Sequence, residues 1–517
     1  MVATPFGPIR AITRWKPARL TTPVSSKPMA FRHLTLCVLS GVLLGASSPP
    51  RRIVDRPNVI VIISDDQGWA DIGYNNPAVY TPHLDKLARG GATLVHHYVM
   101  PQCTPTRVAL MTGRYPGRFG TQAQAANNAP AFPIGTPTMA SMFQDAGYET
   151  FMSGKWHLGS TPGHGPNKFG FDASHGSLTG AVGMYDHRYH AKADTPYDPT
   201  WHRDHKIIPG HEDGTHVTDL TRDEAVRFIE KNRDRPFFLY LPFHAPHLPL
   251  DERGEFVGTP TQPDPKDPRR WYNEDKIRWF HDPQGLIQAE PSRDKRLLLA
   301  TVHHLDSAVG DVVAALERTG QREDTLILFS SDNGPWVTNP KAGGYPHSIP
   351  LTNYSQPSPL RGRKLDVWEG GIHVPGFMNW PGKIPARQVE SLAHIVDWFP
   401  TLATIIGYQP KEPIAWDGVD LTPVVSGDGD APDRDLYWLW NKRTNRWALR
   451  YQRWKIVRYS RQEPSSPADW KLYDLHADPA ETRDLSKSEP EVVAQLHARF
   501  LVHRRKDRKT RWSKPAK

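Results

Sequence analysis

A continuous apolar run that ends in a cluster of polar residues is the feature that most constrains the fold of this chain. Residues 58–63 are rich in Val and Ile, and they lead directly through a serine into Asp65 and Asp66. A strand that is apolar on both sides is typical of a parallel sheet whose two faces are covered by helices. The run therefore predicts an α/β domain with polar residues at the carboxyl end of a buried strand.

The same order of helix, buried strand and polar cluster recurs along the chain. Helices are predicted over 81–90, 138–146, 219–231 and 297–316, and buried strands over 148–152, 237–241 and 325–329. The clusters that follow these strands contain Lys155 and His157, His244 and His247, and Asp332 and Asn333. Each cluster alone has an ordinary explanation as a turn or a structural histidine. Together they favour one site, because open α/β sheets bind ligands outside the carboxyl ends of their strands.

The length of 517 residues exceeds the usual size of a single core, so a large domain with a smaller companion is expected. From about residue 430 the pattern changes to short strands over 447–459 and 470–475, followed by a helix that a capping box at 488–491 would open. The predicted units are a leader and signal peptide over 1–50, a catalytic domain over 51–429, a C-terminal α+β subdomain over 430–503 and a basic tail over 504–517. Two loops, 251–293 and 335–360, are expected to shape substrate choice.

The N-terminal region has the pattern of a cleavable export signal. Basic residues at 32–33 precede a short apolar run over 34–45, and small residues follow at 46–48, with Met29 as the expected start. A retained N-terminal arm is the alternative. The run is too short to span a bilayer and no other stretch approaches that length, so we expect an exported protein, periplasmic or secreted, without stable membrane insertion.

The chain is basic, with a formal net charge of +9 and a concentration of Lys and Arg in its last residues. Such a run is usually a solvated tail, and attraction to an anionic polymer is the functional alternative. No helix-turn-helix, zinc-finger or RNA-recognition pattern accompanies it, so no nucleic-acid partner is expected.

The second cysteine of the chain stands in an unusual pattern. Cys37 lies in the predicted signal, so the mature protein would carry Cys103 as a lone thiol, which excludes a disulfide within one chain. A lone cysteine is most often a small buried hydrophobe. Here it begins Cys-Thr-Pro-Thr-Arg at 103–107, followed by Leu-Met-Thr-Gly-Arg at 110–114. A chance Cys-x-Pro-x-Arg is expected in roughly one such chain in a hundred.

With these motifs the chain resembles the formylglycine-dependent sulfatases, from residue 58 to about residue 485. The resemblance implies an alkaline-phosphatase-like fold: a large mixed, mostly parallel sheet sandwiched by helices, with a small C-terminal sheet-and-helix subdomain. It also implies that a formylglycine-generating maturation enzyme oxidises Cys103 to formylglycine, whose hydrated aldehyde attacks the sulfur of a sulfate ester.

Asp65, Asp66, Asp332 and Asn333 offer only oxygen ligands, which suits Ca²⁺ or Mg²⁺ better than zinc. The resemblance implies that these residues and the modified Cys103 bind Ca²⁺, with Mg²⁺ as the alternative ion. If Cys103 opens a helix through 108–111, it lies where backbone N–H groups favour an anion.

The resemblance assigns the remaining site residues. Arg107 would hydrogen-bond the hydrated aldehyde, and Lys155 and Lys364 would bind the sulfate. His157 would take a proton from the hydrated aldehyde, for which an imidazole is suited near neutral pH. His247 would protonate the leaving oxygen, and His244 is the competing choice for that role.

The chain departs from the family pattern at a few positions near this site. Thr106 replaces the commoner Ser in the cysteine motif. Arg363, Leu365 and Asp366 replace smaller residues around the lysine, and His373 stands where Arg is usual. These changes predict a rim adapted to a particular substrate.

Two other functions fit the same pattern. A phosphate or phosphonate ester hydrolase of the same fold is one, since a fold does not fix the group transferred. An inactive sulfoglycan-binding protein is the other, if Cys103 is never oxidised. Export, the basic surface and the loops favour a sulfated carbohydrate as substrate over another sulfate ester.

Overall fold

The computed structural model describes residues 56–189, 198–210, 214–250, 252, 283–291, 293–336, 360–441 and 444–511. The chain divides into two compact units, Met1–Ile53 and Val54–Lys517, and every described element belongs to the second unit. The predicted signal, most of both predicted loops and residues 512–517 lie outside the described residues.

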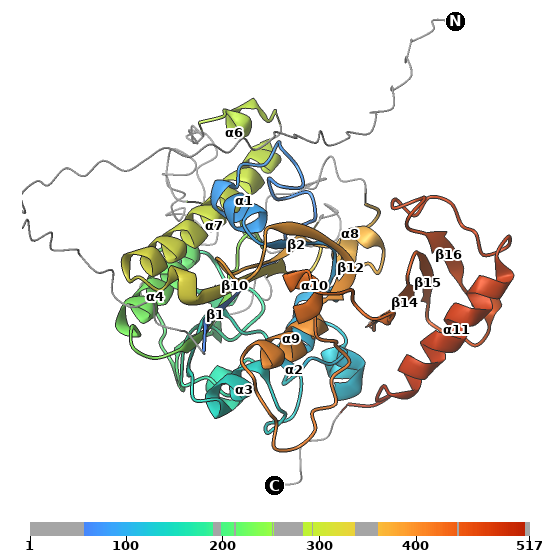
Figure 1. Cartoon of the computed structure of the whole chain (residues 1–517), viewed down its shortest axis with the longest axis horizontal. Helices are drawn as coiled ribbons and strands as arrows, with labels where there is room; N and C mark the ends of the chain where they lie inside the picture. Colours follow the sequence, from blue (N-terminus) through green and yellow to red (C-terminus); the bar gives the residue numbers. More distant parts are fainter. Residues whose placement is uncertain are drawn as a thin grey trace, which may run out of the picture. The chain divides into compact units, whose positions relative to one another are not determined.

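A ten-stranded mixed sheet forms the centre of the second unit, in the order β12-β2-β11-β10-β1-β9-β3-β4-β7-β8 (Figure 1). Its strands are β1 Asn58–Ser64, β2 Ala92–Tyr98, β3 Glu149–Lys155, β4 Ala173–Ser177, β7 Trp201–Arg203, β8 Lys206–Ile207, β9 Phe237–Pro242, β10 Thr325–Ser331, β11 Gly376–Asn379 and β12 Arg387–His394. The central strands β10, β1, β9, β3 and β4 are parallel, whereas β11, β7 and β8 are antiparallel to their neighbours. The predicted mixed, mostly parallel sheet is confirmed.

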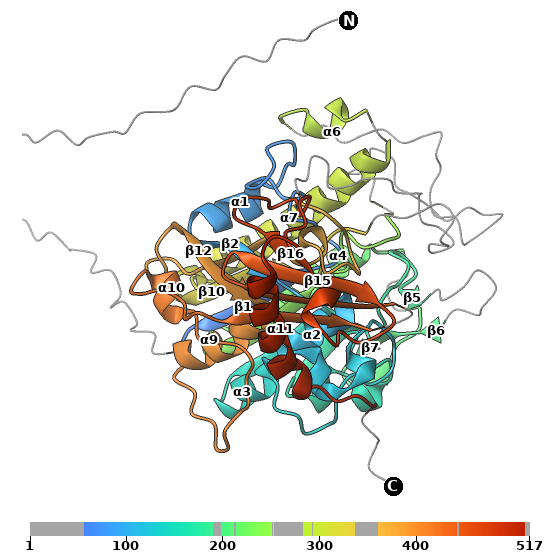
Figure 2. The ribbon, with the colours of Figure 1, turned by 90° about the vertical axis from the view of Figure 1, so that its right-hand side faces the viewer.

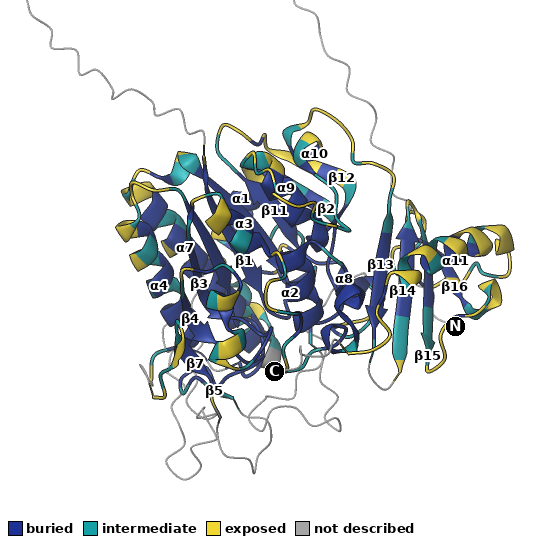
Figure 3. Cartoon of the chain, turned by 90° about the horizontal axis from the view of Figure 1, so that it is seen from below, coloured by how far each residue is buried: buried dark blue, intermediate teal, exposed yellow. Residues whose placement is uncertain are grey.

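Helices cover both faces of this sheet (Figure 3). They are α1 Pro82–Arg89, α2 Cys103–Thr112, α3 Met139–Asp145, α4 Val217–Lys231, α6 Leu286–Ala289, α7 Arg293–Arg318, α8 Glu369–Ile372, α9 Trp398–Ile405 and α10 Thr422–Ser426. Short 3₁₀ turns lie at η1 Pro116–Phe119, η2 Thr121–Ala123, η3 Pro162–His164, η4 Pro166–Lys168, η6 Arg322–Asp324 and η7 Ile395–Asp397, and β5 Arg188–Tyr189 pairs with β6 Asp198–Pro199.

The side chains of strand β1 are apolar on both faces of the sheet, so both faces must be packed against helices. Val59 and Val61 pack into the core that includes α2, α3 and α9, while Ile60 and Ile62 pack into the core that includes α1, α4 and α7. All of these side chains are fully buried, because successive residues of a strand point to opposite faces. The unbroken apolar run in the sequence follows from this position.

The C-terminal part forms a separate antiparallel sheet of four strands, with α11 Pro490–Arg505 packed against it (Figure 2). Its elements are β13 Asp435–Trp440, β14 Asn445–Tyr451, β15 Trp454–Ser460, η8 Pro467–Asp469 and β16 Lys471–Asp474. The single strand predicted over 447–459 is wrong, since this segment is the hairpin of β14 and β15. Its turn contains Gln452 in a left-handed conformation and lacks the usual Gly, Pro or Asn signal.

The predicted capping box at the start of α11 is also wrong. The helix begins after Glu489 with no side-chain cap, and the Ser488 hydroxyl donates to the Leu485 carbonyl at 3.1 Å. By contrast Thr138 caps α3, accepting from the backbone N–H of Ser141 at 3.0 Å. A Ser-x-x-Glu pattern predicts a cap only where the preceding backbone is extended enough to turn the hydroxyl toward the helix.

One described helix has a length and composition that would suit a membrane span, although none was predicted from the sequence. It is the Lys295–Arg318 part of α7, and 72% of its apolar window is buried inside the protein. Its apolar side chains pack against α4 and the central sheet, as expected of a core helix.

Candidate active site

The carboxyl ends of β1 and β10 bring the four predicted oxygen-bearing side chains together. The two strands are parallel and in register at their last residues. As a result the Asp66 backbone N–H donates to Asp332 Oδ1 at 3.2 Å, and Asn333 Nδ2 donates to Asp66 Oδ1 at 2.8 Å. Asp65, Asp332 and Asn333 are fully buried. Residues far apart in the sequence thus form one acidic cluster.

Strands β9 and β3, the next in the sheet, add a histidine and a lysine. His247 follows β9, with Nε2 3.7 Å from Asp66 Oδ2 and Nδ1 2.7 Å from the Leu248 carbonyl oxygen. Lys155 ends β3, and its ammonium pairs with the Asp65 carboxylate. The sequence predicted Lys155 just past the strand, whereas it is the last strand residue.

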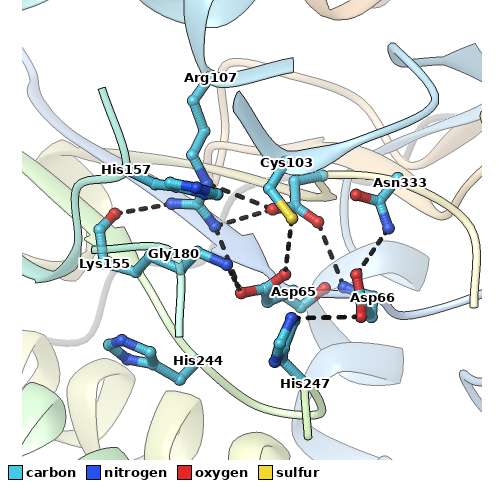
Figure 4. Close-up of polar contacts among 12 residues, drawn as sticks. Asp65, Asp66, Cys103, Arg107, Lys155, His157, Gly180, His244, His247 and Asn333 are labelled. Carbon is cyan, nitrogen blue, oxygen red and sulfur yellow. Dashed lines mark hydrogen bonds and ion pairs between the residues drawn. The ribbon is translucent and has the colours of Figure 1, made fainter. Parts of the chain in front are cut away.

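Helix α2 points its first turn at the same cluster (Figure 4). Cys103 is the first helical residue and lies buried, with Sγ 3.6 Å from Asp65 Oδ1. Arg107, one turn later, is fully buried and donates from Nη2 to Asp332 Oδ2 at 2.9 Å and from Nη1 to the Lys155 carbonyl at 2.7 Å. The thiol therefore lies at the positive end of a helix, among fixed charges of both signs.

Lys364 reaches the cluster from a segment between Leu360 and Trp368 that contains no strand or helix. Its Nζ lies 2.6 Å from Asp66 Oδ1 and its side chain is only 7% exposed. The unusual residues beside it therefore do not displace it. His373 lies away from the cluster, with Nε2 2.8 Å from the Val95 carbonyl oxygen, and the Thr106 hydroxyl donates to the Met100 carbonyl at 3.0 Å.

His157 follows β3 in a left-handed backbone conformation with φ 56°. Its ring packs so closely on Gly180 that a Cβ on that glycine would lie 2.3 Å from Nε2. Its Nδ1 is buried and has no hydrogen-bond partner among the described residues. Sequence reasoning missed Gly180, because no local pattern distinguishes a glycine that faces a distant ring.

His244 occupies a different position from His247. Its Nε2 is 2.7 Å from the Ser177 hydroxyl oxygen, and its ring centroid is 6.3 Å from that of Trp201. His247, not His244, contacts the carboxylate cluster.

Burial and neighbouring charges oppose each other in this site. Burial alone would raise the pKa of Asp65 and Asp66, yet Lys155, Lys364 and His247 outweigh it and lower both. Burial would lower the pKa of Lys364, but the carboxylates raise it well above its usual value. Both carboxylates therefore remain ionised and the lysine stays charged.

Two other groups of the site, Cys103 and His157, are held in their uncharged forms. Burial, reinforced by Asp332, raises the pKa of the Cys103 thiol above its usual value. Burial lowers the pKa of His157 well below its usual value, and Lys155 and Arg107 lower it further. An unmodified Cys103 is thus a poor nucleophile here, while His157 is a neutral base.

The cluster has the donors that a hard divalent cation requires. Asp65, Asp66, Asp332 and Asn333 converge, and the Asn333 Oδ1 atom is buried without a hydrogen-bond partner among the described residues. Potential ligand atoms of Asp65, Asp66, Cys103 and His247 all lie within 4.8 Å of one another. Carboxylate and amide oxygens fit Ca²⁺ or Mg²⁺.

A second buried cluster, made of His216, Asp219, Glu252 and His304, lies between α4 and α7. His304 contacts Glu252 Oε2 through Nδ1 at 2.8 Å and Asp219 Oδ1 through Nε2 at 3.4 Å. His216 Nδ1 accepts the backbone N–H of Thr218 at 3.2 Å, and its Nε2 lies 3.9 Å from Glu252 Oε1. The cluster is a charged hydrogen-bond network around His304, although ligand atoms of His216, Asp219 and His304 also lie within 4.8 Å of one another, a spacing that could hold a metal ion.

Comparison with known proteins identifies the family. The family model described as Sulfatase matches residues 57–408. The chain belongs to the sulfatase family. A second model, described as N-sulphoglucosamine sulphohydrolase, C-terminal, matches residues 363–506 of this sulfatase.

Individual relatives agree with this assignment. The sulfatase is 30% identical over 496 residues to arylsulfatase J of Mus musculus, covering 86% of this chain and 75% of the relative. It is 31% identical over 423 residues to N-acetylgalactosamine-6-sulfatase of Canis lupus familiaris, covering 78% and 71% of the two chains. The crystal structure of Ps i-CgsB in complex with k-i-k-neocarrahexaose superposes with a TM-score of 0.71 at 28% identity, covering 88% of this chain and 94% of that chain.

The predicted resemblance and the predicted enzyme class are thereby confirmed. The protein is an arylsulfatase-like sulfuric ester hydrolase. Sulfatases generally use Ca²⁺ and a formylglycine, and the buried acidic cluster beside Cys103 is the candidate metal site of this one.

Proposed function

We propose that this sulfatase removes sulfate from a sulfated carbohydrate, using a formylglycine made from Cys103 and a Ca²⁺ ion bound at Asp65, Asp66, Asp332 and Asn333. One observation carries the proposal: the Cys103 side chain opens helix α2, 3.6 Å from Asp65, inside a cluster of buried carboxylates, lysines and histidines. That position suits a nucleophile that must contact both the anionic sulfate group and the metal cation.

The cationic side chains of the site bind and orient the sulfate group. Lys155 and Lys364 each pair with one metal-site carboxylate, so a sulfate entering the cluster meets two fixed ammonium groups. Arg107, held by Asp332, faces the side chain at position 103 and favours an ionised oxygen there. A formylglycine at position 103 would supply the attacking hydroxyl, and a cation held by the four oxygen-bearing side chains would neutralise charge on the sulfate oxygens.

Two histidines move the protons. His157 is neutral and has its Nδ1 free of hydrogen bonds among the described residues, so it can accept a proton from position 103 when sulfate is expelled. His247 keeps Nδ1 on the Leu248 carbonyl and directs Nε2 into the cluster, where it would deliver a proton to the leaving oxygen. Burial lowers the pKa of His247 below its usual value, and the charges of Asp65 and Asp66 offset only part of that effect.

The relatives support a sulfated carbohydrate as the substrate class. One is named as an N-acetylgalactosamine-6-sulfatase, and the structure of Ps i-CgsB contains k-i-k-neocarrahexaose. The overall positive charge of this chain suits an anionic saccharide.

Export and maturation complete the proposal. The signal pattern before residue 49 supports release from the cytoplasm, and the cysteine motif supports recognition by a formylglycine-generating enzyme. We expect the mature N-terminus near residues 46–48.

Peptide mass spectrometry of protein coexpressed with a formylglycine-generating enzyme tests the nucleophile. An aldehyde or its hydrate at position 103 is expected, together with turnover of para-nitrophenyl sulfate that Cys103→Ala abolishes. An unmodified thiol in an inactive protein would favour the sulfoglycan-binding alternative.

A panel of sulfated sugars, sulfated phenols and matched phosphate esters tests the substrate class. The proposal expects the highest kcat/KM for a sulfated sugar. Turnover of sulfated phenols alone would contradict the carbohydrate, and preferential turnover of phosphate esters would contradict sulfate as the transferred group.

A further inference from the structure

The segment that contains Lys364 has no regular secondary structure, although the lysine side chain must be positioned accurately in the active site. It contains no strand or helix up to Trp368, and Leu365 has a left-handed φ of 78°. A branched residue in this conformation costs of order 1 kcal/mol and persists only where surrounding contacts determine it. A lysine on a flexible stem also gains no rigidity from its own side chain. The placement of Lys364 therefore depends on neighbours.

Part of this support comes from the catalytic domain. The Lys364 N–H donates to the Pro335 carbonyl at 2.9 Å, and the Leu365 N–H donates to the Pro101 carbonyl at 2.7 Å. These bonds satisfy the N–H groups on one side of the segment.

The rest of the support comes from the C-terminal sheet. Arg446 on β14 donates from Nη1 to the Leu365 carbonyl and, at 2.8 Å, to Asp366 Oδ1. The Tyr459 hydroxyl on β15 donates to Asp366 Oδ1 at 3.2 Å and accepts the Val367 N–H at 3.1 Å. The three residues that follow Lys364 are thus all bonded to another sheet.

Arg446 and Tyr459 are themselves fixed by the sheet. They are directly opposite each other in the β14–β15 pairing, and Trp440 is opposite Arg446 in the β13–β14 pairing. The Arg446 guanidinium lies 4.7 Å from the Trp440 ring centroid and 5.1 Å from that of Tyr459. A guanidinium held between two aromatic rings is a rigid donor.

We propose that Arg446 and Tyr459 are positioning residues of the active site, which fix Lys364 against the sulfate by binding the backbone and Asp366 beside it. The inference rests on the proposed role of Lys364 in sulfate binding. It gives the C-terminal sheet a part in substrate binding although neither residue contacts the acidic cluster in the described structure. It also explains Asp366, a departure from the family pattern, as the acceptor that joins the two residues.

Inhibition by inorganic sulfate and kcat/KM for para-nitrophenyl sulfate test this inference in the matured full-length protein. Arg446→Met is expected to raise the inhibition constant for sulfate about 10-fold, since a charged hydrogen bond is lost. Tyr459→Phe removes only the hydroxyl and is expected to cause a smaller change, about 3-fold. Arg458→Met is the matched control, because Arg458 lies on the opposite face of β15 and pairs with Asp469.

A double-mutant cycle with Lys364→Ala separates positioning from general stability. If Arg446 acts through Lys364, Arg446→Met adds no further loss to Lys364→Ala. The inference would be overturned if the losses of sulfate inhibition in Arg446→Met and Lys364→Ala were additive. It would also be overturned if Arg458→Met weakened inhibition as much as Arg446→Met does. If Arg446→Met does not fold, the same cycle is measured with Tyr459→Phe and Lys364→Ala, and its result tests the positioning role.

The cycle also distinguishes failure of the inference from failure of the proposed function. If Lys364→Ala leaves sulfate inhibition unchanged, the assigned role of Lys364 is wrong and the inference falls with it. If Lys364→Ala weakens inhibition but neither C-terminal variant does, only the positioning role is overturned.

Discussion

The contact between His157 and Gly180 restricts the position of one side chain of this site. The glycine leaves room for the imidazole, whose buried Nδ1 has no hydrogen-bond partner among the described residues. Any side chain at position 180 must push the imidazole away, because neighbouring strands prevent the backbone from moving freely.

Gly180→Ala is therefore expected to lower kcat by about 10- to 100-fold, since a displacement of the base by about 1 Å removes its alignment. KM for para-nitrophenyl sulfate should change much less, because Lys155 and Lys364, which we propose bind the sulfate, are untouched. Steady-state kinetics of the matured variant measure both constants.

Gly163→Ala provides the control for this substitution. A Cβ at that position would have no atom nearer than the Thr161 hydroxyl at 3.9 Å. Wild-type kcat in Gly180→Ala would show that His157 is not the group that limits proton transfer.

The buried Asn333 amide oxygen leads to a prediction about metal binding. It has no hydrogen-bond partner among the described residues, which is costly unless a ligand pairs with it. Asn333→Ala is expected to reduce the increase in thermal midpoint that Ca²⁺ produces in chelator-treated protein, because binding to the folded state alone stabilises it.

Asn232→Ala, at the end of α4, serves as the control for Asn333→Ala, because Asn232 bonds only its own helix and Gln321. Its midpoint should rise with Ca²⁺ as much as that of the wild type. An undiminished Ca²⁺ response in Asn333→Ala would remove this residue from the proposed ligand set.

At the scale of elements, helices α4 and α7 are joined by the His304 network. Burial opposes a charge on His304, but Glu252 and Asp219 outweigh it and raise the pKa of His304 to about 9. Since the unfolded pKa is about 6.5, the folded state binds the extra proton. This stabilisation is complete below about pH 6.5 and is lost as the pH rises through 9.

The free energy of unfolding of the wild type should therefore decrease by about 3 kcal/mol between pH 6.5 and 10 from this group alone. His304→Gln should lack that part of the decrease. Urea unfolding of both proteins at several pH values measures the difference, and parallel pH profiles would contradict a His304 imidazolium.

The secondary structure was predictable where the sequence pattern is local and continuous. The buried strands β1, β9 and β10 contain unbroken apolar runs because helices cover both faces, so their pattern is visible in the sequence. Strands β2 and β12 were not predicted, since they include polar or half-buried residues at the side of the sheet. The hairpin turn at Gln452 is determined by pairing of its strands, for which the turn itself carries no signal.

At the scale of the whole molecule, a residue after α11 links the C-terminal sheet to the part of the chain that contains the ten-stranded sheet. The Arg118 guanidinium, buried after α2, pairs with Asp417 at 3.0 Å and also with Asp507. Asp507 in turn accepts from the Tyr437 hydroxyl of β13 at 2.6 Å. Part of the segment expected to be a basic tail is thus integral to the fold, and α11 itself continues to Arg505.

Truncation after His503 is expected to lower the thermal midpoint by roughly 5–10 °C, because it leaves a buried guanidinium with one of its two carboxylates missing. Truncation after Arg511 keeps Asp507 and should leave the midpoint within about 2 °C of the wild type. Differential scanning calorimetry compares the two, and equal midpoints would contradict a structural role for Asp507.

The sequence by itself determined the chemistry of the site and its place in the sheet. Cys103 and Arg107 are one turn apart on the same helix. Each acidic or histidine cluster follows closely after its strand, so its position at the edge of the sheet follows from its place in the sequence. The parallel α/β class followed from the same apolar runs.

Only the tertiary structure decided which distant groups support that chemistry. Gly180 leaves room for the His157 ring, and Lys364 reaches the site from a segment without helix or strand. Arg446 and Tyr459 hydrogen-bond to that segment. All of these contacts depend on packing between residues remote in the chain. Such contacts leave no periodic pattern in the sequence, because the partners are selected by the arrangement of whole elements and not by their neighbours along the chain.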